Sequence, residues 1–185
     1  IVVTLWVGAF GGRWQLPTAM APLAWLQHEM LFGYLAAIIG GFVSAAIPNW
    51  TGRPTVTGWP VAAVVGLWLA ARLAILFSAT VPPLVGAVLD VLYLMVLLAY
   101  AAREIVASGN RNKPILIVLA LFITACGLDH AGTMGALADP ALGMRMGFAV
   151  ILLLVSIIGG RIIPAFTRNW LMRQEHARKL PVMPG

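Results

Sequence analysis

Long apolar stretches alternate with short polar connections along this chain, a pattern typical of a protein that crosses a lipid bilayer several times. Five of the stretches approach the roughly 20 residues that a helix needs to span the hydrocarbon core. They cover residues 30–50, 59–79, 84–102, 114–135 and 142–163. A further apolar stretch at residues 1–10 is too short to span, so we expect it to be the end of an incomplete first helix. The pattern therefore predicts an all-α fold, a polytopic transmembrane helical bundle with about six spans.

The connections hold the prolines, glycines and charged residues that separate membrane helices. Residues 11–27 are expected to form a loop, and residues 51–57 a short turn. The last span is expected to stop at Pro164. The transmembrane helical domain would then occupy residues 1–166 and be followed by a basic tail at residues 167–185.

The placement of lysine and arginine predicts the orientation, because basic residues in short loops stay on the cytoplasmic side. Arg53, the loop at residues 103–113 and the tail fall on one side of the predicted topology, which we take as cytoplasmic. The loop at residues 11–27 then lies on the periplasmic side. Its Trp14 and Trp25 fit the belt of aromatic side chains found at membrane interfaces.

The composition supports the membrane assignment and excludes several kinds of protein. Hydrophobic residues make up 61% of the chain and charged residues 10%, whereas soluble domains are about 45–50% apolar. The net charge of +6 does not indicate nucleic acid binding, because the basic residues cluster at the ends of apolar stretches. The lipid bilayer is thus the expected partner. Ile1 opens the chain within an apolar stretch, so we expect the sequence to be part of a longer protein.

A series of small residues in the first complete span predicts close helix packing. Gly33, Ala37, Gly41 and Ala45 recur every four residues, and such series let another helix backbone approach closely. Alanine and glycine are also common in membrane helices for no specific reason. We nevertheless expect this face to pack against a neighbouring helix.

Ionisable residues occur inside the spans, where each charge costs roughly 2.5–3.5 kcal/mol on insertion scales and needs a partner. At 1.5 Å per residue, Arg72 and Asp90 each lie roughly 10–12 Å from the periplasmic ends of their spans. This matching depth predicts an ion pair, which is either structural or functional. His28 and Glu29 lie at the same end of the bundle.

His28 and His130 are the candidate metal or cofactor ligands, since neutral imidazole binds both iron and copper. The alternative is that each histidine is a hydrogen-bonded core residue. Cys126, His130 and Met134 share one helix face and would suit a soft metal such as copper, although plain packing is the commoner explanation. Asp129 points elsewhere on its helix, so we do not expect it to support His130.

Four motifs in the sequence resemble the NnrS family of bacterial membrane proteins. They are HEMLFG from His28, AIPNWTGRP from Ala46, GWP from Gly58 and GGRIIPAFTRNW from Gly159. The resemblance extends over residues 22–171 and corresponds to the amino-terminal half of a longer family chain. It implies a multi-pass protein of the bacterial inner membrane that carries haem and copper and belongs to the nitric oxide and denitrification response.

Several residue roles follow from this resemblance. His28 and His130 would hold the iron of a b-type haem near the periplasmic face, and Arg72 would hold a haem carboxylate. Nitric oxide would be a ligand, and copper a second metal. One position departs from the family pattern: Leu26 stands where many members have a further histidine.

Two other kinds of function stay open at the level of sequence. The chain would be a structural subunit if it packed against other membrane subunits, or the remainder of a longer chain, through the small-residue face. It would be a channel or transporter if Arg72, Asp90 and Asp129 lined an aqueous path. A hydrolase or kinase is excluded, since the sequence has neither a glycine-rich phosphate loop nor a nucleophile with an adjacent base.

Overall fold

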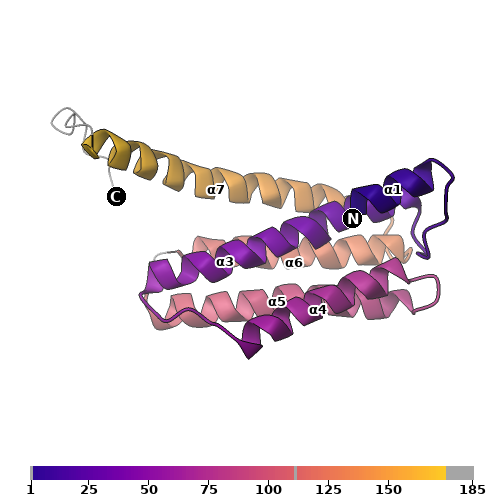
Figure 1. Ribbon diagram of the computed structural model, residues 1–185, viewed down its shortest axis with the longest axis horizontal. Helices are drawn as coiled ribbons and strands as arrows, with labels where there is room; N and C mark the ends of the chain where they lie inside the picture. Colours follow the sequence, from indigo (N-terminus) through magenta and orange to yellow (C-terminus); the bar gives the residue numbers. More distant parts are fainter. Residues whose placement is uncertain (1, 111, 174–185) are drawn as a thin grey trace. The chain divides into compact units, whose positions relative to one another are not determined.

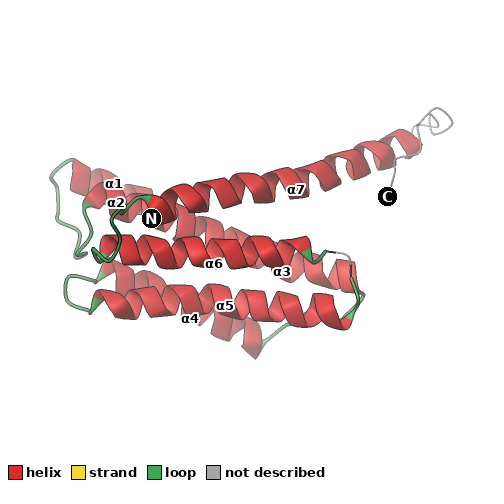
Figure 2. Cartoon of the chain, turned by 180° about the vertical axis from the view of Figure 1, so that it is seen from behind, coloured by secondary structure: helices red, strands yellow, loops and turns green. Residues whose placement is uncertain are grey.

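The computed structural model describes residues 2–110 and 112–173, and most of these residues are helical (Figure 1, Figure 2). The helices in chain order are α1 (Val2–Phe10), α2 (Pro22–His28), the π-helix η1 (Glu29–Leu35), α3 (Ala36–Thr51), α4 (Trp59–Leu76), α5 (Pro83–Ala107), α6 (Pro114–Thr133) and α7 (Leu142–Arg173). The predicted all-α, polytopic fold is confirmed for this part of the chain.

Five continuous helical segments are long and apolar enough to cross a membrane. They are Pro22–Thr51, Trp59–Leu76, Pro83–Ala107, Pro114–Thr133 and Leu142–Met172. The first of these includes α2, η1 and α3, so it begins several residues earlier than the sequence pattern predicted. Pro22 occupies the first helical position, where its missing N–H costs nothing.

Two expectations about the ends of the helices are wrong. Trp25, expected in an interfacial loop, belongs to α2 and is only 2% exposed. Pro164, expected to end the last span, lies inside α7. Proline is tolerated within membrane helices because other groups can satisfy the freed backbone carbonyl. Residues 167–173 of the predicted tail also belong to α7, and the remainder from residue 174 onward lies outside the described residues.

The structure divides into two compact units, Ile1–Val150 and Ile151–Gly185. In the first unit, α5 is central and packs against α3, α4 and α6 (Figure 1). The described part of the second unit is the remainder of α7, up to Arg173. The candidate site described below lies entirely within the first unit.

The packed face of α3 differs from the predicted one. Gly33 and Gly40 are buried, whereas Gly41 and Ala45 are exposed. Four residues turn an α-helix by about 400°, so a series spaced by four drifts about 40° per step away from a straight face. Gly40 provides the close approach instead, since a Cβ atom there would overlap the hydroxyl of Tyr93 on α5.

The start of α7 packs closely against α6 and η1 through two glycines. A Cβ atom on Gly143 would overlap the backbone of Asp129. A Cβ atom on Gly147 would lie 2.7 Å from Leu31 Cδ2 and 2.9 Å from Phe32 Cζ. The two glycines of the stretch GMRMG therefore form a small-residue packing motif. The apolar pattern of the sequence did not predict this motif.

Candidate metal centre

Asp90 of α5 is the centre of a buried polar cluster in the first unit. Its Oδ2 atom lies 3.1 Å from His28 Nε2 and 3.2 Å from His130 Nε2. The thiol of Cys126 donates to the same oxygen across 3.4 Å. Asp90 and Cys126 are 0% exposed. A single carboxylate oxygen thus brings together the two histidines predicted to be ligands.

His28 is held from its other side by a second carboxylate. Its Nδ1 atom donates to Oδ2 of Asp129 on α6, at 2.8 Å. The His28 ring also packs beside those of His130 and Phe32, with centroid distances of 4.7 and 5.4 Å. Because both ring nitrogens face carboxylates, the orientation of this fully buried imidazole is fixed.

Arg72 of α4 forms a double ion pair at the edge of the cluster. Its Nη2 atom donates to Oδ1 of Asp90, and its Nη1 atom donates to Oε1 of Glu29 at 3.0 Å. The predicted pairing of Arg72 with Asp90 is confirmed. Two of the guanidinium nitrogens are thus engaged within the cluster, and the third, Nε, is buried without a hydrogen-bond partner.

The helices place these side chains together through their spacing along the chain. On α6, Asp129 and His130 follow Cys126 by three and four residues, so each of them lies beside Cys126 on the helix surface. His28 and Glu29 lie where α2 passes into the π-helix η1. Short π-helical segments occur frequently at functional sites.

The same segment makes room for the arginine. A Cβ atom on Gly33 of η1 would lie only 2.6 Å from Arg72 Nη1, so the glycine permits the guanidinium to approach. The indole of Trp68, one turn before Arg72 on α4, donates to the carbonyl oxygen of Gly33 at 3.0 Å. Together these contacts hold α4 against η1 at the level of the cluster.

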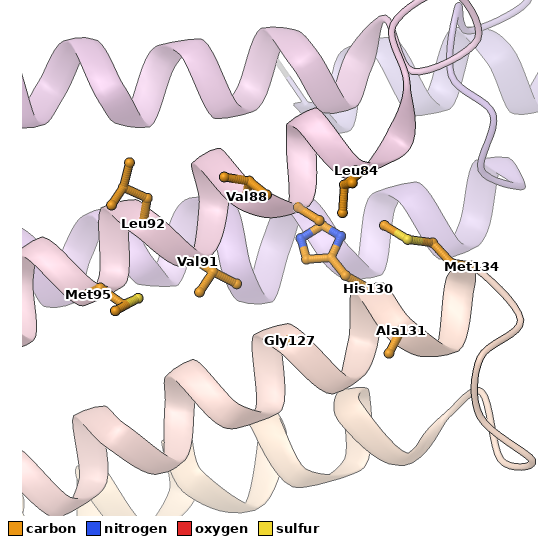
Figure 3. A pocket seen from close by; sticks show the side chains of 10 residues that line it. Leu84, Val88, Val91, Leu92, Met95, Gly127, His130, Ala131 and Met134 are labelled. Carbon is orange, nitrogen blue, oxygen red and sulfur yellow. The ribbon is translucent and has the colours of Figure 1, made fainter.

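Two pockets border the cluster, and His130 lines both of them. The first has a volume of about 410 Å³ and lies between α5 and α6 (Figure 3). Its lining consists of Leu84, Ala87, Val88, Val91, Leu92, Met95, Gly127, His130, Ala131 and Met134. The second, of about 380 Å³, is lined mainly by residues at the end of α6, Thr133 among them, and by residues of the connections before α2 and α5 and after α6, which include Ser78.

A family model described as NnrS protein matches residues 1–184. The chain belongs to the NnrS family. Membership indicates a membrane protein of the nitric oxide response and agrees with the five candidate spans. The family is also associated with metal and haem binding, and in this member a buried histidine and aspartate cluster is present. No curated protein and no solved structure matches the chain.

The structure of this NnrS protein shows where each candidate residue from the sequence lies relative to the cluster. His28, His130 and Arg72 all contact Asp90 directly. Cys126 contacts it as well, whereas Met134 is 42% exposed and lines both pockets. The predicted face of Cys126, His130 and Met134 is thus divided between the cluster and the pockets.

The sequence of this NnrS protein did not predict the contacts that two members of the cluster make. Asp129 was expected to point away from His130, and instead it supports His28 on a different helix. Glu29 was placed at the correct end of the bundle without a partner, which proves to be Arg72. Glu29 directly follows His28 in the HEMLFG motif, and this adjacency was the feature of the sequence that could have placed Glu29 in the cluster.

Proposed function

We propose that this protein binds a divalent transition-metal ion between His28, His130 and Asp90 and uses it in the nitric oxide response. The observation that carries the proposal is the convergence of one potential ligand atom from each of these three buried residues. The three atoms lie within 4.8 Å of one another. Two imidazoles with one carboxylate form a common donor set for redox-active metals.

Two of the three distances between the donor atoms fit such an ion. Two ligand atoms that are each about 2.0–2.1 Å from one metal, at angles near 90–109°, lie roughly 2.9–3.4 Å apart. The observed separations from Asp90 Oδ2 to His28 Nε2 and His130 Nε2 are 3.1 and 3.2 Å. An ion would therefore replace the two hydrogen bonds without a large movement of the helices.

The charge balance of the cluster is compatible with a divalent cation. Glu29, Asp90 and Asp129 contribute three negative charges and Arg72 one positive charge, which leaves two negative charges among buried groups. Uncompensated charge away from water is costly. Either two protonated histidines or one divalent ion with two neutral histidines balances the cluster.

The surrounding residues have distinct roles in this proposal. Asp129 would fix the tautomer and orientation of His28 through Nδ1, as carboxylates do for many metal-binding histidines. Arg72 holds Oδ1 of Asp90, so that Oδ2 faces the histidines. Glu29 in turn anchors Arg72. A redox-active ion held there would supply a coordination position for nitric oxide.

Haem, the cofactor predicted by resemblance, fits this arrangement less well. His28 is 0% exposed and both of its ring nitrogens face carboxylates, so it would have to turn away from Asp90 and Asp129 to bind haem iron. His130 borders two pockets and is the histidine beside which a larger group would fit. Haem on His130 is therefore the second candidate.

The identity of the ion is narrowed by the donor set. Two histidines and one carboxylate are typical of non-haem iron, whereas a nearby thiol favours copper. Cys126 Sγ lies 3.4 Å from Asp90 Oδ2 and supplies a sulfur atom in contact with the cluster. We favour copper, in agreement with the resemblance noted above.

The described residues support neither of the two alternatives from the sequence, a channel or transporter and a structural subunit. Arg72, Asp90 and Asp129 are bonded within a closed, buried cluster and do not line an open aqueous path. The proposed small-residue contact surface is divided, because Gly33 of η1 is buried and Gly41 of α3 is exposed. A metal site explains the cluster without either function.

Elemental analysis and visible spectroscopy of the purified protein test the proposal. We expect about one copper or iron per chain, no Soret band and loss of the metal in both His28→Ala and His130→Ala. His176→Ala, which changes the third histidine of the chain, is the control and should retain the metal. A Soret band that survives His28→Ala and disappears in His130→Ala would select haem on His130 instead. Full metal content in the His28→Ala, His130→Ala double variant would refute both.

A further inference from the structure

The pocket between α5 and α6 lies between the outer surface of the first unit and the metal centre. Leu84, Val88 and Met95 on its α5 side are exposed, as expected for side chains that face lipid on a membrane-spanning helix. Ala87 and Val91, neighbours of Asp90 along α5, form part of its wall. The pocket therefore begins at the membrane-facing surface and ends beside the cluster.

The lining has one polar side chain, and it belongs to the metal centre. His130 bonds to Asp90 through Nε2, and its ring also borders the pocket between Leu84, Val88 and Met134 (Figure 3). The other lining residues carry only apolar side chains, or none in the case of Gly127. A charged molecule would lose its hydration here without compensation.

We infer that this pocket is the passage through which a small uncharged ligand reaches the metal centre directly from the lipid phase. The inference rests on the proposed function, which supplies nitric oxide as the ligand. A small, uncharged gas molecule needs no hydrogen bonds from the wall and can approach the ion past the edge of His130. The ion itself, being charged, must come by another path, and the second pocket at the connections offers Ser78 and Thr133.

Gly127 offers a way to close the passage without disturbing the helix packing. It lines the pocket from α6, and a Cβ atom built on it meets no atom within 4 Å. A leucine at this position would therefore fit and project into open space. Gly66 on α4 is a matched control, because a Cβ atom there also meets nothing within 4 Å and the residue does not line this pocket.

The first experiment uses the metal-free protein in nanodiscs, with xenon as an apolar probe. The probe should shift the methyl NMR signals of Met95 and Met134, which line the pocket. Gly127→Leu should abolish these shifts and Gly66→Leu should retain them. Unchanged methyl signals in the wild-type protein would mean that an acyl chain fills the pocket, and this result would overturn the inference.

The second experiment measures the association rate of nitric oxide with the metal-loaded protein by stopped flow. We expect Gly127→Leu to slow association about tenfold or more, with Gly66→Leu at the wild-type rate, because a blocked approach lowers the rate of encounter. Val91→Phe, which narrows the pocket from α5, should act like Gly127→Leu if that variant fails to fold.

The two experiments separate failure of the passage from failure of the metal site. Equal rates in folded, metal-loaded Gly127→Leu and wild-type proteins would refute the passage and leave the metal centre intact. If no metal binds, the proposed function fails, and so does nitric oxide delivery to an ion. The xenon measurement still decides whether an apolar pocket open to lipid is present.

Discussion

Nδ1 of His28 and Oδ2 of Asp129 lie 2.8 Å apart, although the two residues are separated by 101 positions in the chain. The contact joins the end of α2 to α6 and fixes which nitrogen of His28 faces Asp90. Metal-binding histidines almost always donate their second N–H in this way. Asp129 is therefore best explained as a residue that positions His28.

Asp129→Asn tests this role. The amide keeps the size of the side chain but removes its charge, so we expect the affinity for the metal to fall about 10- to 100-fold while the protein stays folded. Competition with a chromophoric chelator measures the affinity. Asp139→Asn is the control, since Asp139 is an exposed carboxylate paired with Arg145 away from the cluster. Equal affinities in the two variants would show that Asp129 does not act through His28.

Arg72 and Asp90 should depend on each other for stability. Removing one member of a buried pair leaves an uncompensated charge, so Arg72→Leu and Asp90→Leu should each destabilise the protein by about 3–5 kcal/mol. Because Arg72 also pairs with Glu29, the double variant should recover only part of this loss. Adding Glu29→Gln to the double variant should recover more. Thermal unfolding in detergent measures each step.

The ion pair between Arg53 and Glu104 provides the comparison for these variants. The Arg53 side chain is 42% exposed, and exposed pairs contribute only about 0–1 kcal/mol. Arg53→Leu should therefore change the unfolding temperature far less than Arg72→Leu. If the Arg72 and Asp90 substitutions proved simply additive, the two residues would not be energetic partners.

Gly143 should be intolerant of a single added methyl group. Gly143→Ala would force its Cβ atom against the backbone of Asp129, and overpacking of this kind costs about 1–3 kcal/mol. We also expect weaker metal binding, because displacement of Asp129 disturbs His28. Gly41→Ala, at an exposed position with no atom within 4 Å, should change neither property. A Gly143→Ala variant with wild-type stability would show that α7 does not need this close approach.

The orientation in the membrane is a prediction from the basic residues of the short loops. A cytoplasmic carboxyl-terminal tail requires the loop before α2 and the connection between α4 and α5 to be periplasmic. Fusion of alkaline phosphatase after Lys179 should therefore be inactive, and fusion of a cytoplasmic fluorescent reporter should be bright. The opposite result would invert the topology. It would also move the proposed metal centre to the cytoplasmic half of the bilayer.

The sequence predicted which residues lie at similar depth, and much of the cluster follows from this depth. Apolar stretches fix the approximate ends of each span, and counting residues from the ends placed Arg72 beside Asp90. The same count put His28 and Glu29 at the same end of the bundle as Arg72 and Asp90. The convergence of these residues on Asp90 was thus partly accessible from the sequence.

The rotation of each helix about its own axis was not accessible in the same way. Apolar residues surround membrane helices on all sides, since lipid and protein interiors are similarly apolar, and so the pattern does not mark the packed face. The contact between His28 and Asp129 and the burial of Gly40 in place of Gly41 both depend on rotation. The π-helix adds a change of rotation that local sequence does not signal.

The seven residues of η1 connect two stretches of α-helix, and the wider π-helical turn accommodates an additional residue between them. Deleting one residue between positions 30 and 35 would remove the residue that the wider turn accommodates, so a regular α-helix could run from Pro22 to Thr51 with His28 and α3 in nearly their present relative rotation. Circular dichroism and metal content of such a variant should both stay close to those of the wild-type protein, and loss of metal would show that the π-helical geometry itself is needed to place His28. A gene could thus gain or lose this π-helix through one codon and still encode a membrane protein of the same architecture.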